Sequence, residues 1–301
     1  MSDKLPHTEA VNERTRGMDL LTTTALVDLL IAEQRKALDS VSDESGRIAE
    51  VVDTIASRLR KGGRLHYVGA GTSGRLGFLD ASECPPTFGT EPEMICAHIA
   101  GGLGAIVRAV EGAEDDDTAG AAEMRDHLEP NDVVIGLSAS GSAPFVVGAL
   151  KAAKATGAWT IAVTHDAESD VAKAADARIV LQTGAEPLAG STRLRAGTAQ
   201  KVLLNAISTA TMVRLNKVYD NLMVDLVATN KKLRRRAVRL VAQLANVSED
   251  RAAALLEQAD GRVKVAAIMG RTGLSAQEAQ GRLDAADGSL RHTLQQAQGD
   301  R

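Results

Sequence analysis

The stretch "HYVGAGTSGRLGFLDASECPP" (residues 66–86) decides the fold of this chain. It begins with a short apolar run, turns at glycines and continues with apolar residues at helical spacing, which is typical of a buried strand followed by a helix. Gly69, Gly71 and Gly74 have the spacing G-x-G-x-x-G of dinucleotide-binding loops. A nucleotide site is therefore the first hypothesis that the remaining sequence has to support.

Short apolar runs alternate with helical segments beyond residue 64. Runs of this kind, separated by helices such as residues 143–157, predict a parallel sheet that is covered on both faces. The fold class that we predict is therefore α/β, with a parallel sheet flanked by helices on both faces. The expected strands are residues 64–69, 93–99, 132–138, 159–165 and 177–182.

Helical periodicity extends on both sides of this region. It occurs in residues 24–41 and 44–63, where the second segment stops at a glycine pair, and in residues 196–218. The last segment carries Lys201, Asn205 and Ser208 on one face, because they recur at helical spacing. We expect this stripe to be satisfied against a neighbouring element or subunit rather than to bind a ligand.

A change of pattern after residue 230 predicts two domains, residues 1–230 and 231–301. The second segment contains short helices with their own start signals, including Ser248 and the capping box from Ser275 to Glu278. We therefore expect a small helical bundle there. The basic run "KKLRRR" (residues 231–236) is interpreted as a solvated helix start, since it lacks interleaved aromatic residues.

Composition excludes several classes of protein. The chain has 301 residues and a net charge of −4, which argues against a general nucleic-acid or membrane-surface role. Its two cysteines form no C-x-x-C pair, and no His/Cys cluster has metal spacing, so neither a disulfide framework nor a metal site is expected. The polar start and the absence of a long apolar run predict a cytoplasmic protein.

The glycine loop lacks the partner that a dinucleotide site requires. An acidic residue should end the second strand about twenty residues later, but residues 98–102 are His, Ile, Ala and two glycines. Gly71, Thr72 and Ser73 instead place hydroxyl and backbone N–H groups where a strand turns into a helix, which suits a phosphate monoester. Ordinary helix caps rich in Ser and Gly are the alternative interpretation.

The same pattern recurs after the third expected strand. Residues 138–144 read "SASGSAP", again a Ser/Gly turn between a strand and a helix. Turns at the carboxyl ends of parallel strands form the ligand crevice of open sheets. We therefore predict a phosphosugar site with these contacts: Gly71, Thr72, Ser73, Ser138, Ser140, Gly141 and Ser142.

Longer blocks of the sequence resemble one particular family of proteins. The paired turns resemble the sugar isomerase (SIS) fold, and the sequence is similar to the N-acetylmuramic acid 6-phosphate etherases over essentially its whole length. The blocks that carry this similarity are "GAGTSGRLGFLDASECPPTFG" (69–89), "IAGG" (99–102), "AVEGAED" (109–115), "AGTAQK" (196–201) and "NLMVDLVATNKKL" (221–233).

The resemblance implies a cytoplasmic homodimer that acts on a phosphosugar without a cofactor. It implies cleavage of the lactyl ether of N-acetylmuramic acid 6-phosphate, with Glu83 and Glu114 as the acid/base residues. A helix that stops before Pro85 would place Glu83 at its negative end and favour the protonated acid. Glu114 precedes a helix start, which favours an anionic base, although the neighbouring acids at 115–117 act in the opposite direction. The alternative interpretations are a solvated helix-end residue for Glu83 and a capping cluster for residues 111–117.

Two other functions share these features. An aldose–ketose isomerase of the same fold needs a carboxylate base but no acid at a C3 leaving group, and a phosphosugar sensor needs neither. Retention of both Glu83 and Glu114 favours catalysis. We leave three residues outside the predicted site: His165, which we interpret as structural, and Arg193 and Arg195, for which surface charge is the competing explanation.

Overall fold

The structure of the chain is a computed structural model that describes residues 7–226, 228 and 231–299. These residues form two compact units. The first comprises the described parts of Met1–Ala81 and Glu93–Ser208, and the second comprises Ser82–Pro92 and the described parts of Thr209–Arg301. The domain boundary predicted at residue 230 stays a prediction.

The predicted parallel sheet forms the centre of the first unit. Its strands have the order β2-β1-β3-β4-β5, and each neighbouring pair is parallel. All five expected strands are confirmed, with ends that differ by no more than two residues. The strands are β1 (Leu65–Gly69), β2 (Ile95–Ile99), β3 (Val133–Leu137), β4 (Trp159–Thr164) and β5 (Ala177–Val180).

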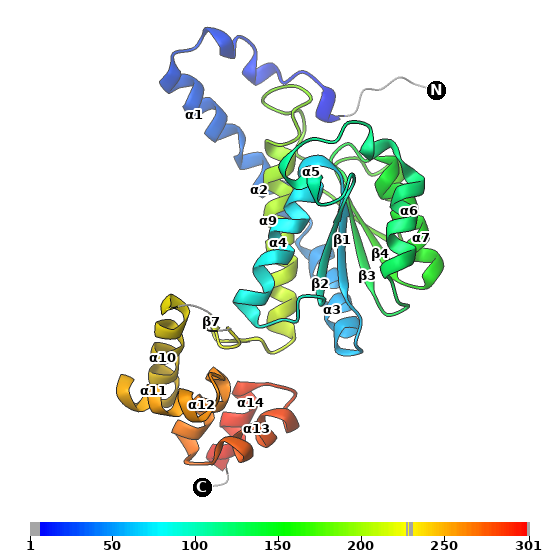
Figure 1. Cartoon of the computed structure of the whole chain (residues 1–301). Coiled ribbons are helices and arrows are strands. Elements are labelled where there is room, and N and C mark those ends of the chain that lie inside the picture. Colours follow the sequence, from blue (N-terminus) through cyan, green and yellow to red (C-terminus); the bar gives the residue numbers. More distant parts are fainter. Residues whose placement is uncertain (1–6, 227, 229–230, 300–301) are drawn as a thin grey trace. The chain divides into compact units, whose positions relative to one another are not determined.

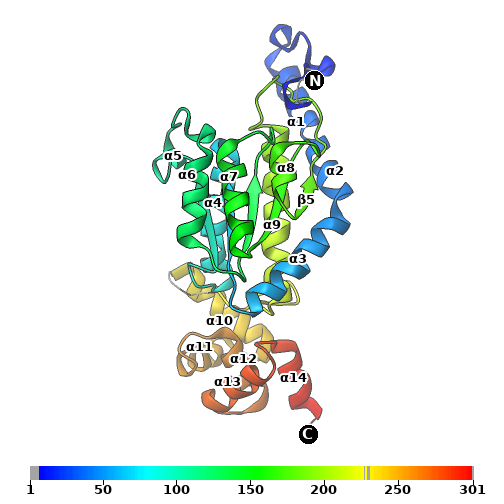
Figure 2. The same cartoon turned by 90° about the vertical axis from the view of Figure 1, so that its right-hand side faces the viewer.

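Helices cover both faces of the sheet, which confirms the predicted fold class (Figures 1 and 2). On one face, apolar side chains of three helices pack against Val68, Val134 and Ala162. These helices are α6 (Asp117–His127), α7 (Pro144–Thr156) and α8 (Asp170–Ala174). The helices of the other face are α3 (Ser45–Arg60), α4 (Gly71–Phe88) and α9 (Arg195–Arg214).

The N-terminal segment contains more helices than its periodicity predicts. Residues 24–41 fall into two helices because the chain closes a tighter turn at Gln34, whose N–H donates to Ile31 O at 3.1 Å. The predicted stop at the glycine pair is confirmed, since α3 ends at Arg60 and Gly62 has φ +82°. The remaining elements of the first unit are η1 (His7–Glu9), η2 (Glu13–Thr15), η3 (Met18–Leu20), α1 (Thr23–Glu33), α2 (Arg35–Asp43), α5 (Gly104–Val107) and η4 (Ala113–Asp115).

Helix α4 does not stop before Pro85, as the sequence predicted. It continues through Pro85 and Pro86 to Phe88. Proline removes a backbone donor and usually ends a helix. Cys84 and Phe88 are both buried and lie four residues apart, so they share one side of the helix and their packing holds its last turn. The tertiary contact overrides the local preference.

A buried carboxylate joins α4, β1 and α9 in the first unit. Asp80 is 4% exposed and accepts hydrogen bonds from Tyr67 Oη (2.9 Å), Asn205 Nδ2 (2.7 Å) and Ser208 Oγ (3.1 Å). This confirms that the polar stripe of α9 is satisfied against a neighbouring element for Asn205 and Ser208, whereas Lys201 is exposed. The stripe therefore fixes the packing of α9.

Two glycines bring α6 and α7 into backbone contact. A Cβ atom at Gly120 would lie 1.9 Å from Phe145 O, and one at Gly148 would lie 2.0 Å from Asp117 O. Neither position has room for a side chain unless the helices separate. The close packing of these two helices therefore requires a residue without a side chain at both positions.

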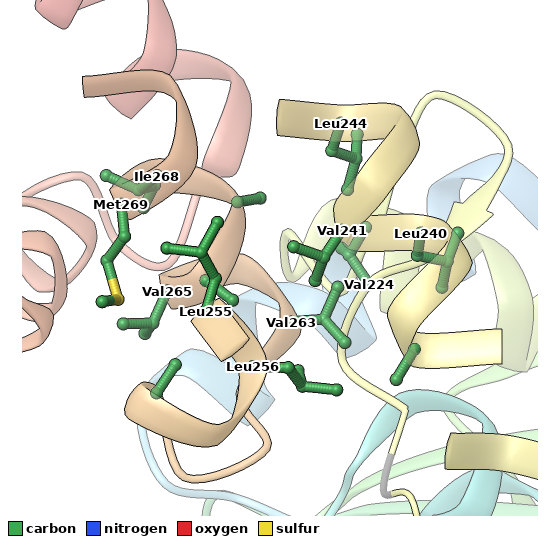
Figure 3. Packing of buried hydrophobic residues seen from close by; sticks show 14 of the residues in the cluster. Val224, Leu240, Val241, Leu244, Leu255, Leu256, Val263, Val265, Ile268 and Met269 are labelled. Carbon is green, nitrogen blue, oxygen red and sulfur yellow. The ribbon is translucent and has the colours of Figure 1, made fainter. Parts of the chain in front are cut away.

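The second unit contains the predicted helical bundle and a small hairpin that the sequence did not indicate. The hairpin pairs β6 (Val218–Tyr219) with β7 (Leu222–Met223). Leu240, Leu255 and Ile268 contribute to the shared core of the bundle (Figure 3). The caps at Ser248 and Ser275 are confirmed, and the basic run begins a helix as predicted. The helices are α10 (Lys231–Ala245), α11 (Glu249–Gln258), α12 (Val263–Thr272), α13 (Ala276–Ala285) and α14 (Leu290–Gly299).

Within the described residues, no helix combines the length and the apolarity that crossing a bilayer requires.

Replacing Gly120 with Ala should destabilise the first unit by about 1–3 kcal/mol, because the new methyl group forces α6 away from α7. Gly46→Ala is the matched control: Gly46 is an exposed position of α3 with nothing within 4 Å of its Cβ, so alanine should be neutral or slightly stabilising there. Urea unfolding followed by the fluorescence of Trp159 measures both. Equal stability of the two variants would contradict the tight contact.

Candidate active site

The first Ser/Gly turn is shaped by a close approach of strand and helix. A Cβ at Gly69 would lie 2.7 Å from Gly74 N, and a Cβ at Gly74 would lie 2.6 Å from Ile99 Cγ1. Gly71 has φ +50°, a conformation that disfavours other residues. The spacing of the three glycines is therefore explained by backbone packing, without a nucleotide.

Helix α4 begins inside this turn, at Gly71, so its unpaired N–H groups and positive end are located there. Ser73 is buried, and its Oγ donates to Gln200 Oε1 at 2.9 Å. Thr72 is half-buried. Of the two predicted hydroxyl contacts, Ser73 already has a partner from α9, and Thr72 remains the more accessible.

Gln200 is a residue that the sequence did not single out. Its side chain is 1% exposed, and Nε2 has no hydrogen-bond partner among the described residues. A buried amide donor of this kind is costly unless something pairs with it. The signal in the sequence was its position beside Lys201 in the "AGTAQK" block, but no pattern distinguishes a buried glutamine from an exposed one.

The second Ser/Gly turn connects β3 to α7. Ser138 is buried, and its Oγ accepts the N–H of Gly141 at 3.1 Å. Gly141 has φ +75°, and a Cβ there would overlap Ser169 Oγ at 2.5 Å. Ser140 Oγ and Ser142 Oγ lie 2.9 Å apart. Ser138 and Gly141 thus shape the loop, whereas the exposed Ser142 presents its hydroxyl to solvent.

The sheet brings the two turns together. β1 and β3 are neighbouring parallel strands, and Gly69 pairs with Leu137 at their carboxyl ends. The strand order also changes direction between β1 and β3, and open α/β sheets bind their ligands at this kind of position. Ser142 also lines an open depression of about 440 Å³ together with Lys151 and Lys173.

The two predicted catalytic residues are both exposed but belong to different compact units. Glu114 lies in η4, just ahead of the α6 helix start capped by Asp116, so its predicted local setting is confirmed. Glu83 lies inside α4, in the part that belongs to the second unit. The helix-end argument for Glu83 as the acid is wrong, because α4 ends at Phe88.

The structure also places the three polar residues that were left outside the predicted site. Arg195 is buried; it donates to Glu33 and to Ala185 O (2.6 Å), and so anchors α1 to the start of α9. Arg193 is exposed. His165 Nδ1 contacts Leu181 O at 2.5 Å and therefore donates to it. Burial lowers the pKa of His165 to about 4, which keeps the ring neutral near pH 7.

Comparisons with known proteins agree on one family. Residues 47–154 match the glucokinase regulatory protein N-terminal SIS domain, and residues 106–210 match the SIS domain family. N-acetylmuramic acid 6-phosphate etherase from Geobacillus thermodenitrificans is 49% identical over 96% of this chain and 98% of its own length. The etherases of Gloeobacter violaceus and Clostridium beijerinckii are 47% and 46% identical, over 99% and 96% of this chain and 100% and 95% of their own.

The neutral His165 should make the first unit less stable in mild acid. An unfolded chain binds a proton at this histidine as the pH falls through about 6.5, whereas the folded chain does so only near a pH of about 4. The contribution of the neutral His165 to the free energy of unfolding is therefore complete above about pH 6.5, and it is lost as the pH falls towards 4.

His165→Leu removes this linkage. The difference in unfolding free energy between the wild type and this variant should shrink by about 2 kcal/mol from pH 7 to pH 5. Urea titrations at both values, followed by the fluorescence of Trp159, measure it. A difference that stays constant would show that His165 is not held neutral.

Proposed function

Since the chain belongs to the N-acetylmuramic acid 6-phosphate etherase family, we propose that it cleaves the D-lactyl ether of N-acetylmuramic acid 6-phosphate to N-acetylglucosamine 6-phosphate and D-lactate. The observation that carries this proposal is 49% identity to one etherase over 96% of the chain. The paired Ser/Gly turns at the switch point of the sheet give it independent support, because they suit a sugar phosphate.

The reaction proceeds by elimination and addition. In the open-chain sugar the C3 oxygen lies β to the C1 aldehyde, so a base that removes the C2 proton allows the C3–O bond to break. Its electron pair leaves with the lactate oxygen, which takes a proton from an acid. Water then adds at C3 of the unsaturated aldehyde, and C2 regains a proton. The route requires one base and one acid and no redox step.

Glu83 and Glu114 supply these two groups. Both carboxylates are exposed and therefore accessible to a substrate, and both occupy the matching positions of the family blocks "ASECPP" and "EGAED". Glu114 lies just ahead of the α6 helix start and is assigned the role of the base at C2. Glu83 then acts at the leaving oxygen.

The substrate phosphate binds at the two turns. The positive ends of α4 and α7 and their unpaired backbone N–H groups attract an anion, and the accessible hydroxyls of Thr72 and Ser142 add hydrogen bonds. Gly71, Ser73, Ser138, Ser140 and Gly141 complete the phosphosugar contacts. Ser73, Ser138 and Gly141 contribute chiefly by holding the loops in shape, since their polar groups already have partners.

The assembly and compartment follow the same family. The chain acts as a cytoplasmic homodimer, and apolar side chains on α1 support pairing through this helix. Val27 is 47% exposed and Ile31, one turn further on, is 66% exposed. Neighbouring exposed apolar side chains can form part of an interface when they belong to a contiguous patch.

Purified protein incubated with N-acetylmuramic acid 6-phosphate should release D-lactate, and a coupled lactate assay measures the release. No lactate at high enzyme concentration would refute the etherase proposal. Glu83→Gln and Glu114→Gln should each lower kcat at least a hundredfold, because each removes one proton-transfer group.

Deuterium uptake at C2 in heavy water separates the two roles in these variants. Glu83→Gln should still exchange the C2 proton of unreacted substrate, whereas Glu114→Gln should not. The opposite pattern would exchange the roles of acid and base, and exchange in neither would show that both residues are required for proton removal.

Ile31→Glu should convert the dimer to a monomer, because it places a charge in the apolar α1 surface. Light scattering coupled to size exclusion measures the mass against the 31.5 kDa of one chain. Val107→Glu is the control, since Val107 is 84% exposed on α5, away from α1 in the sequence. Dissociation of both variants or of neither would contradict an α1 interface.

A further inference from the structure

A buried histidine pair lies on the face of the sheet that α6 covers. His66 on β1 and His98 on β2 stack with ring centroids 5.3 Å apart and planes at 20°. His66 Nδ1 lies 3.0 Å from His98 Nε2. The two residues are 1% and 7% exposed, so water does not replace contacts that the rings fail to make. The two imidazoles therefore depend on protein groups for their hydrogen bonds.

A carboxylate faces each end of this pair. Asp132 Oδ2 lies 3.3 Å from His66 Nε2, and Glu123 Oε1 lies 2.7 Å from His98 Nδ1. Burial alone would raise the pKa of Asp132, but hydrogen bonds from Arg64 and from the N–H of Glu129 hold it below its usual value. Asp132 is therefore an acceptor only.

The pair has one proton too few for its contacts. Three contacts need a hydrogen: Asp132 with His66, His66 with His98, and His98 with Glu123. Two imidazoles carry one ring proton each when neutral, and a carboxylate supplies none, so the third hydrogen has to be replaced by an added proton or by a cation. Among the described residues, His66 Nε2 is buried and makes no hydrogen bond, since its contact with Asp132 Oδ2 at 3.3 Å lacks hydrogen-bond geometry. A buried nitrogen of this kind indicates a group that the protein part alone does not supply, and the side chains beside the pair show which group fits.

His127 completes a set of ligands beside this deficit. It lies one turn after Glu123 on α6, and its Nδ1 donates to Glu123 O at 2.6 Å, which leaves the lone pair on Nε2. Its ring centroid is 5.3 Å from that of His98. One ligand atom from each of His98, Glu123 and His127 lies within 4.8 Å of the others.

We propose that His98, Glu123 and His127 bind a divalent transition metal ion, with Zn²⁺ as the expected occupant. Two imidazoles and a carboxylate are a ligand set that suits Zn²⁺ and disfavours Mg²⁺ or Ca²⁺. The ion replaces the proton between His98 Nδ1 and Glu123. His98 Nε2–H then donates to His66 Nδ1, and His66 Nε2–H donates to Asp132.

When the ion replaces this proton, every contact of the histidine pair becomes either a hydrogen bond or a metal bond, including the contact that lacks a hydrogen. It also produces the arrangement in which a ligating imidazole donates its other N–H towards a carboxylate, here through a second ring. Zn²⁺ at about 2.0–2.1 Å from its ligands needs ligand atoms about 3.3 Å apart. The side chains of Glu123 and His127 are 41% and 51% exposed, so they can adjust to this separation and admit the ion.

The ion ties β2 to the last turns of α6. None of its ligands belongs to the two Ser/Gly turns, and neither proposed catalytic glutamate takes part. The site is therefore structural and independent of the proposed reaction. No spacing in the sequence indicated it, because its ligands come from elements 25 residues apart that only the parallel sheet brings together.

Titration of the full-length protein, first treated with EDTA, tests the site. Co²⁺ should give the visible absorption of a low-symmetry nitrogen and oxygen site, and calorimetry with Zn²⁺ should give one ion per chain. His127→Ala and Glu123→Gln should each weaken binding at least tenfold. Asp126→Asn, an exposed position on the same helix, is the matched control and should bind as the wild type does.

Nitrogen-15 NMR of the histidine rings supplies a second measurement that a merely adventitious surface ion would not change. On addition of Zn²⁺, His66 Nε2 should move from the shift of a bare nitrogen to that of a protonated one. Absence of stoichiometric binding, unchanged binding in His127→Ala, or a thiolate charge-transfer band with Co²⁺ that places the ion on Cys96 would each overturn the proposal.

Discussion

The close approach of β1 to α4 is the constraint on which the candidate site depends. Gly69 and Gly74 allow the strand and the helix to touch through their backbones, and Gly71 turns the chain between them with a positive φ. This geometry aims the first N–H groups of α4 past the end of β1. The same approach determines where Asp80, nine residues along α4, meets Tyr67 and α9. One tight turn thus fixes both the proposed anion site and the packing of one face of the sheet.

The sequence predicted the elements well where local pattern and tertiary packing agree. Buried strands of five or six residues leave an apolar run that few other structures explain, and the caps at Ser248 and Ser275 act through neighbours in the chain. Prediction failed where packing overrides the local signal. Pro85 indicates a helix end, but the buried side chains of Cys84 and Phe88 keep α4 helical. The β6–β7 hairpin has strands of two residues, too short for any periodicity.

The candidate site was predicted only as far as its loops. Strand-to-helix turns can be read from glycines and hydroxyls, and the neighbouring positions of β1 and β3 confirm that the two turns lie together. The sequence does not show which of these hydroxyls are accessible. Ser73 and Ser138 differ from Thr72 and Ser142 only in contacts that form in the folded chain. Buried polar groups such as Gln200 and His66 are equally invisible in a single sequence, since their pairing joins residues far apart in the chain.

The α6–α7 pair connects features that the sequence presents separately. The η4 turn with Glu114 leads into the start of α6, and the second Ser/Gly turn leads into α7. Gly120 and Gly148 allow backbone contact between the two helices, so both turns lead into one closely packed helix pair. The last turns of α6 carry Glu123 and His127, whose contacts reach β2 through His98. A cation bound there would hold the far end of the same helix pair without contacting either turn.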